Sequence, residues 1–102
     1  MTIDFAKDGT TLNVRPDGSL DSVTAPELDK RLVPQIEGIS EVIFDLEKVD
    51  YVSSSGLRVL VATDQVMEKR KGCMKIIHAG PYILEVLDMT GLMNALTVVR
   101  ED

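Results

Sequence analysis

The chain has 102 residues and a formal net charge of −6, with 44% hydrophobic and 27% charged residues. This length and balance predict one globular domain over residues 1–102 with a single core. The negative charge argues against a nucleic-acid partner, because the longest basic cluster is the run of three at residues 69–71. No apolar run approaches ~20 residues, so we expect no membrane association and a cytoplasmic location. A single cysteine, Cys73, and a single histidine, His78, offer neither a disulfide nor a metal-site spacing.

Two alternating segments open the chain and predict a β-hairpin. Residues 1–8 and 10–15 place hydrophobic side chains at alternate positions, and the Asp8-Gly9 pair between them is a turn signal. Residues 16–18, Pro-Asp-Gly, predict a further turn, after which residues 19–21 predict a short strand.

A first helix is expected to follow and to end at Gly38. Thr24 is the expected N-cap, with Pro26 in the first turn and Glu27 three residues after the threonine. Gly38 is typical of the residue after a helix, and Pro34 is expected to bend the last turn.

The second half of the chain alternates strand and helix patterns. Residues 41–46 are almost continuously hydrophobic, which is typical of an interior strand. A polar loop follows; the expected elements after it are a helix over 55–71, a parallel strand over 73–78, a helix over 81–90, a helical turn over 92–96 and a short strand over 97–99. The expected fold class is α/β, with a mixed sheet of four to five strands and helices packed on one face.

Three consecutive serines, Ser53, Ser54 and Ser55, stand where the loop meets the second long helix. A helix N-terminus presents free backbone N–H groups and favours anions, so this position suits a phosphate. One of the serines is explained as an N-cap, which leaves two hydroxyls. The loop lacks the G-x-S-x-G pattern of hydrolases and the Gly-rich Lys-Ser/Thr pattern of phosphate-binding loops. We therefore expect neither catalysis by this chain nor a cofactor.

Three segments together resemble a known family. They are Gly18-Ser19-Leu20-Asp21 before Thr24-Ala25, the run from Val42 through Ser53-Ser54-Ser55-Gly56-Leu57, and Leu87-Asp88-Met89-Thr90-Gly91-Leu92. They resemble the STAS domain of the bacterial anti-sigma factor antagonist (anti-anti-sigma) type, over nearly the whole chain. In the family, the serine after Asp in a D-S-[SA]-G-L segment is phosphorylated. That serine corresponds to Ser54, and Ser53 occupies the position of the family's aspartate.

The resemblance implies a regulatory switch. The unphosphorylated domain, a monomer when free, would bind an anti-sigma factor that is itself a serine kinase, and so release a sigma factor. Phosphorylation at Ser54, with Ser53 and Ser55 as second choices, would end binding, and a serine phosphatase would restore it. An alternative is a STAS accessory or scaffold module of a transporter or signalling complex. A third alternative, a small-ligand carrier, would need a sizeable pocket.

The expected partner surface surrounds the serine loop: Asp21, Ser53, Ser54, Ser55, Gly56, Leu57, Arg58 and Val61. A helical wheel assigns a sheet-facing stripe to the residues Val59, Ala62, Thr63, Val66 and Met67. Leu57 and Val61 fall beside Ser54, either as an exposed docking pair or as interhelical core. Arg58 either screens a phosphate on Ser54 or is a solvated helix residue.

Four other residues have weaker claims to a role. Asp45, at the end of the strand over 41–46, could approach the serine loop or serve only a structural role there, and it is a weaker candidate than Asp21. Asp50 and Tyr51 flank the loop and could contact a partner. His78 has no carboxylate at a recognisable spacing, so we expect it to be structural.

Overall fold

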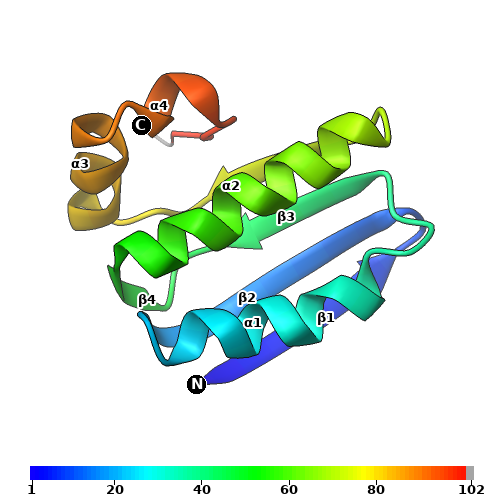
Figure 1. Cartoon of the computed structure of the whole chain (residues 1–102), viewed down its shortest axis with the longest axis horizontal. Helices are drawn as coiled ribbons and strands as arrows, with labels where there is room; N and C mark the ends of the chain where they lie inside the picture. The colour runs from blue at the N-terminus through cyan, green and yellow to red at the C-terminus, as the bar shows by residue number, and fades with distance from the viewer. Residues whose placement is uncertain (101–102) are drawn as a thin grey trace.

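Five strands and four α-helices make up the computed structural model of the chain, which describes residues 1–100 (Figure 1). The last two residues of the expected domain over 1–102 lie outside the described residues. The strands are β1 (Thr2–Asp8), β2 (Thr11–Leu20), β3 (Glu41–Asp45), β4 (Val49–Val52) and β5 (Cys73–Ile77). The helices are α1 (Thr24–Leu32), α2 (Ser54–Lys69), α3 (Pro81–Met89) and α4 (Leu92–Ala95), with a 3₁₀ turn at Val33–Gln35.

The strands form one mixed sheet in the order β1-β2-β3-β5, and β4 pairs with β2 beyond the end of β3. The β1–β2 hairpin is antiparallel and every other pairing is parallel. The expected interior position of β3 is confirmed, because the register places Phe44 between Val14 of β2 and Ile76 of β5. All three side chains are fully buried.

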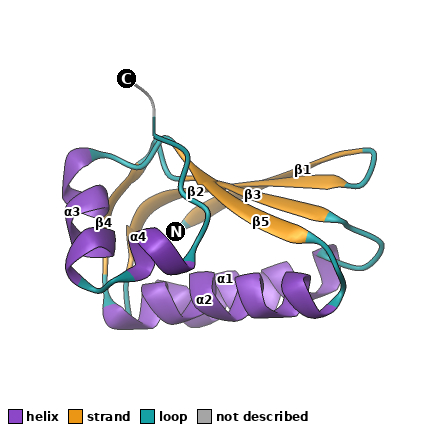
Figure 2. Ribbon diagram, turned by 90° about the horizontal axis from the view of Figure 1, so that it is seen from above, coloured by secondary structure: helices purple, strands orange, loops and turns teal. Residues whose placement is uncertain are grey.

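Helices α1 and α2 cover one face of this sheet and leave the opposite face open (Figure 2). The helix-facing side buries alternate residues such as Leu12, Val42 and Met74, each worth about 1.5–3 kcal/mol of hydrophobic stabilisation. Polar neighbours such as Asn13 and Lys75 lie on the open side. The mixed sheet with helices on one face is therefore confirmed, with α3 placed at the end of the sheet beside β4.

The expected turn at residues 16–18 is wrong, because β2 continues through it to Leu20. Pairing of β2 with β3 ends at Val14, and pairing with β4 begins at Gly18. Pro16 lies between these two stretches of pairing, so its lack of a backbone N–H costs no hydrogen bond to β3 or β4. Gly18, at φ +115°, takes up the register shift where β2 passes from one neighbour to the other.

Two further expectations about strands need correction. The loop after β3 contains an additional strand, β4, which pairs with β2 through only a few residues and has no alternating run long enough to predict it. The expected strand over 97–99 reduces to a single parallel bridge between Val98 and Ile76. The expected helix at 92–96 is present as α4, and Gly91 before it is left-handed at φ +78°.

The buried side of α2 differs from the helical-wheel expectation. The buried residues are Gly56, Val59, Leu60, Thr63 and Met67, whereas Ala62 and Val66 are exposed. The wheel placed the stripe correctly on Val59, Thr63 and Met67 but rotated it away from Leu60. The sequence alone did not show where the sheet lies relative to α1, which borders α2 along a groove lined by Val59 and Ala62.

Candidate functional site

The serine loop joins the end of β4 to the start of α2, and Ser53 fixes this junction. The Ser53 backbone N–H donates to the carbonyl of Leu20 at 2.9 Å, which ties the loop to the end of β2. The Ser53 hydroxyl accepts from the N–H of Gly56 at 3.3 Å, so Ser53 is the N-cap of α2. The expectation that one of the three serines is a cap is confirmed.

Ser54 and Ser55 are the two serines that the cap leaves over. Ser54 is the first residue of α2 and its side chain is exposed. Ser55 is half-buried and lines a shallow groove between α1 and α2. Of the three hydroxyls, that of Ser54 is therefore the most accessible, and it sits where the helix dipole and the free N–H groups of the first turn favour an anion.

Gly56 lets the first turn of α2 pack directly against the sheet. A Cβ at this position would lie 2.7 Å from the carbonyl oxygen of Leu20 and 2.8 Å from side-chain atoms of Leu20 and Val52. No side chain larger than hydrogen fits without movement of the backbone. Gly56 is buried, so its contribution to the expected partner surface is to hold the serines in place.

Asp21, and not Thr24, caps the start of α1. The Asp21 carboxylate accepts from the backbone N–H groups of Val23 at 2.9 Å and Thr24 at 3.0 Å. The Thr24 hydroxyl instead donates to the carbonyl of Ser19 and accepts from the Asp21 N–H. The backbone N–H of Thr24, followed by that of Val23, holds the pKa of Asp21 below its ordinary value.

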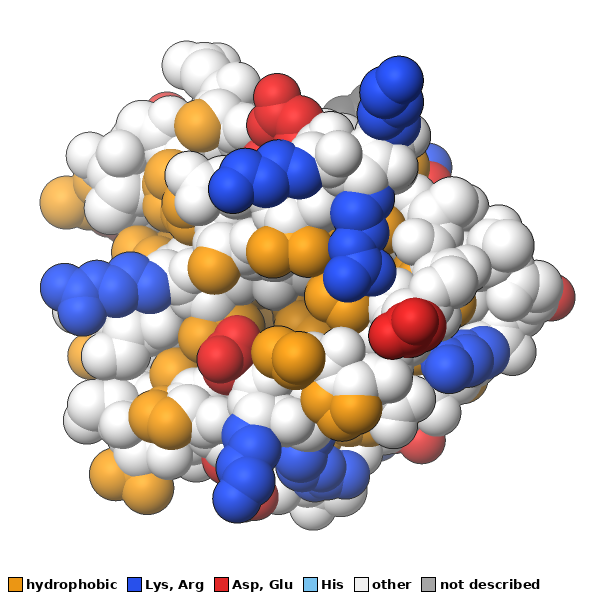
Figure 3. Space-filling view, turned by 45° about the vertical axis from the view of Figure 1, so that its right-hand side comes forward, with side chains coloured by type: hydrophobic (Ala, Val, Ile, Leu, Met, Phe, Trp, Pro, Cys, Tyr) orange, Lys and Arg blue, Asp and Glu red, His pale blue; other side chains and the backbone are white. Residues whose placement is uncertain are grey.

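Leu57, Arg58 and Val61 extend from the serine loop along α2. Leu57 and Val61 are half-buried and pack against the hydrophobic core, so both alternatives hold in part: each has a core contact and an exposed edge. Arg58 is exposed and lines the groove between α1 and α2, together with Asp29. The helix-covered side, seen obliquely, shows hydrophobic side chains around a central hollow with charged side chains at its rim (Figure 3).

An aromatic pair beside the loop involves one residue that the sequence did not single out. The rings of Tyr51, on β4, and Tyr82, on α3, stack with centroids 6.2 Å apart and an interplanar angle of 21°. They are 43% and 47% exposed, and the neighbouring Asp50 accepts a hydrogen bond from Ser19 at 3.0 Å. Tyr82 could not be found from sequence, because its position depends on the unpredicted strand β4.

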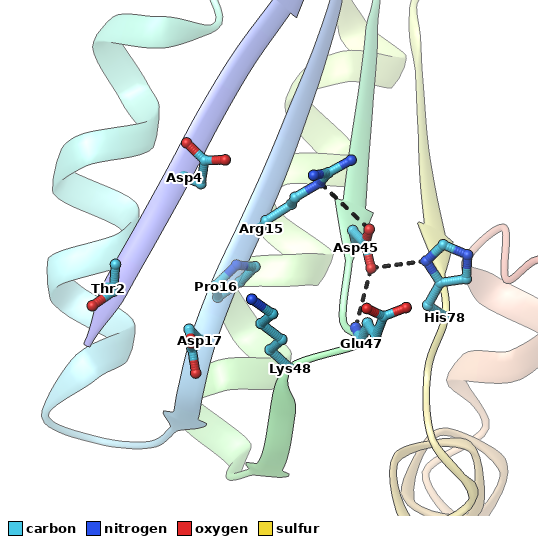
Figure 4. A pocket seen from close by; sticks show the side chains of 9 residues that line it. All are labelled: Thr2, Asp4, Arg15, Pro16, Asp17, Asp45, Glu47, Lys48 and His78. Atoms are coloured by element: carbon cyan, nitrogen blue, oxygen red, sulfur yellow. Dashed lines mark hydrogen bonds and ion pairs between the residues drawn. The ribbon is translucent and has the colours of Figure 1, made fainter.

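Asp45 does not approach the serine loop, so that alternative for it is wrong. It faces the open side of the sheet, where its carboxylate meets Nδ1 of His78 at 2.9 Å and Nε of Arg15 at 3.5 Å (Figure 4). The expectation that His78 lacks a carboxylate partner is therefore also wrong. The parallel register pairs Asp45 of β3 with Ile77 of β5, and His78 directly follows Ile77. The side chains of Asp45 and His78 therefore lie at adjacent strand ends.

Two negative findings concern residues 1–100. No helix among them is long and apolar enough to cross a membrane. No group of three or more His, Cys, Asp or Glu side chains in this range is arranged to hold a metal ion.

Comparison with known proteins assigns the family. The STAS domain family model matches residues 2–101. An anti-sigma-B factor antagonist of Staphylococcus epidermidis is 34% identical over 86 residues, covering 83% of this chain and 80% of the relative. Among solved structures, an anti-sigma factor antagonist from Mycobacterium paratuberculosis has a TM-score of 0.86 at 25% identity, covering 98% of this chain and 86% of that one. The phosphorylated form of the Bacillus cell fate determinant SpoIIAA has a TM-score of 0.76 at 17% identity, covering 98% and 93%. The chain, with its α/β fold and its serine loop at the start of α2, belongs to the STAS domain family.

Proposed function

We propose that the chain is an anti-sigma factor antagonist whose binding to its partner is switched off by phosphorylation of Ser54. The observation that carries the proposal is the difference between two serines of the loop. The Ser53 hydroxyl accepts the N-cap hydrogen bond of α2, whereas the Ser54 side chain is exposed at the N-terminus of the helix. The names of the Staphylococcus epidermidis and Mycobacterium paratuberculosis relatives support the general role.

The position of Ser54 allows a phosphate to change binding without unfolding the domain. A phosphoserine carries about −1.5 to −2 charges at pH 7. The N-terminus of α2 stabilises an anion through its dipole and its free N–H groups, so the fold accepts the added charge. A partner surface docked over Ser54 would instead have to desolvate that charge, which opposes binding.

The partner surface that we propose centres on Ser54 and continues over the exposed edges of neighbouring side chains. Asp21, Leu57, Arg58 and Val61 belong to it from the sequence, and the Tyr51–Tyr82 pair extends it onto β4 and α3. Tyrosines with exposed faces are frequent anchors of protein interfaces. Phosphoryl transfer itself would be performed by the partner, an anti-sigma factor with serine kinase activity, and reversed by a serine phosphatase.

Mass spectrometry after incubation with that kinase and MgATP tests the assignment of the phosphoacceptor. The kinase to use is one encoded by a reading frame next to the gene for this chain and recognisable as an ATP-binding serine kinase. We expect a single phosphate on Ser54 and no modification of the Ser54→Ala variant. Modification of Ser53 or Ser55, with Ser54→Ala still fully modified, would show that a different serine is the acceptor.

A further inference from the structure

A second candidate site lies on the open face of the sheet, away from the helices. A cavity of about 330 Å³ lies over the middle of β2, the end of β3 and the start of β1, with His78 after β5 at its margin (Figure 4). Its volume is at the lower end of the range of small-molecule sites, so it suits a small ligand.

The centre of this cavity is preorganised by Asp45. Its side chain is 11% exposed, and it accepts from the backbone N–H of Glu47 at 3.1 Å as well as pairing with His78 and Arg15. Those contacts satisfy the Asp45 carboxylate and hold the cavity wall in place. Arg15 meets Asp45 through Nε while its side chain remains 62% exposed, so its guanidinium is still accessible to a ligand.

Charges of both signs remain around the cavity. Asp4, Asp17, Glu47 and Lys48 all line it with exposed side chains, and none of them forms an ion pair with another residue in the range 1–100. Figure 4 shows Asp4 on β1 and Arg15 extending from β2 toward β3 and Asp45, whereas Lys48 lies beside Pro16 and Asp17.

This arrangement selects among classes of ligand. A simple anion, such as phosphate, would be attracted by Arg15 and Lys48 but repelled by the unpaired carboxylates of Asp4, Asp17 and Glu47. A simple cation would be attracted by those carboxylates but repelled by Arg15 and Lys48. A small molecule that carries one ammonium and one carboxylate can satisfy both sides at once, with charge-assisted hydrogen bonds at each end.

We propose that this cavity binds a small zwitterion, of the size and charge pattern of a free α-amino acid. The ligand carboxylate faces Arg15 and Lys48, and its ammonium group faces Asp4 and Asp17. The proposal does not depend on the function of the serine loop, which is built from the other end of β4. The wall of the cavity is continuous with that strand, since the Lys48 carbonyl accepts from the N–H of Gly18 at 3.0 Å where β4 joins β2.

Titration of the ¹⁵N-labelled full chain with each common amino acid, followed by NMR, tests the proposal. We expect at least one of them to give saturable shifts, below about 10 mM, at the backbone amides of residues 15, 17, 45–48 and 78. The N-acetylated and α-amidated forms of that amino acid should bind about tenfold more weakly or worse, because each has lost one charge.

Variants separate a built site from a chance contact. Arg15→Gln and Asp4→Asn should each weaken binding about tenfold, and because both side chains are exposed their spectra should remain those of a folded protein. Asp8→Asn on the same strand and Lys30→Gln on α1 lie outside the cavity lining and should leave binding unchanged. The absence of saturable binding by any amino acid, binding of inorganic phosphate in their place, or equal binding of the acetylated and amidated forms would each overturn the proposal.

Discussion

Replacement of Gly56 by alanine tests how the serine loop is held on the sheet. The new Cβ would lie 2.7 Å from the Leu20 carbonyl oxygen, which is part of the backbone and cannot rotate away. Overpacking of this kind costs about 1–3 kcal/mol, and the backbone contact points to the upper part of that range. Alanine recovers about 0.5–1 kcal/mol of helix propensity. We therefore expect a net loss of about 2 kcal/mol, or a melting temperature lower by about 8–16 °C.

Gly80→Ala is the matched control for this measurement by differential scanning calorimetry. Gly80 has φ −70°, and a Cβ there meets no atom within 4 Å, so the control should melt within about 4 °C of the parent chain. Were Gly56→Ala to melt as high as Gly80→Ala, the close packing of α2 on β2 would be wrong, and with it the explanation of how Ser54 is presented.

Three further outcomes are expected. Ser53→Ala should lower the free energy of unfolding by about 1 kcal/mol through loss of the N-cap, whereas Ser55→Ala should leave thermal melts nearly unchanged; equal effects would contradict the assignment of the cap. Asp21 has a lowered pKa in the folded state, so its charge stabilises the fold above its unfolded pKa of about 3.9 and loses that effect as the pH falls through the folded pKa. The melting difference between the parent and Asp21→Asn should therefore be largest at neutral pH and shrink in acid; a pH-independent difference would refute this. Tyr51→Ala and Tyr82→Ala should each weaken binding of the anti-sigma factor about tenfold by calorimetric titration, with the phenylalanine variants close to the parent; unchanged affinity would place the aromatic pair outside the interface.

The features that the sequence predicted are those with strong local patterns. The hydrophobic run at 41–46 predicted the interior strand β3, and the helical pattern between Ser54 and Lys69 predicted α2 to within a few residues. The serine triplet predicted a cap and a candidate phosphoacceptor, because a helix N-terminus has the same hydrogen-bonding requirement in every fold.

The features that the sequence did not predict depend on contacts between distant segments. Pro16 and Gly18 carry the usual signal of a turn, yet they lie within β2 because the strand changes neighbours there. The pairing of Asp45 with His78 follows from the parallel register of β3 and β5, which no local pattern specifies. The stack of Tyr51 on Tyr82 likewise requires the position of α3 relative to β4.

Calorimetric titration of the anti-sigma factor with Ser54→Asp tests the proposed switch most directly. A charge placed beneath a docked surface should weaken binding by about 2–5 kcal/mol, or roughly 30- to several-thousand-fold. The Ser54→Asn variant, whose side chain has the shape of aspartate but no charge, should bind the anti-sigma factor nearly as tightly as the parent. Both variants should melt within a few degrees of it, since an acidic residue in the first turn favours the helix by about 0.3–1 kcal/mol. Equal, undiminished affinity of Ser54→Asp and Ser54→Asn for the anti-sigma factor would contradict a charge-driven switch at Ser54.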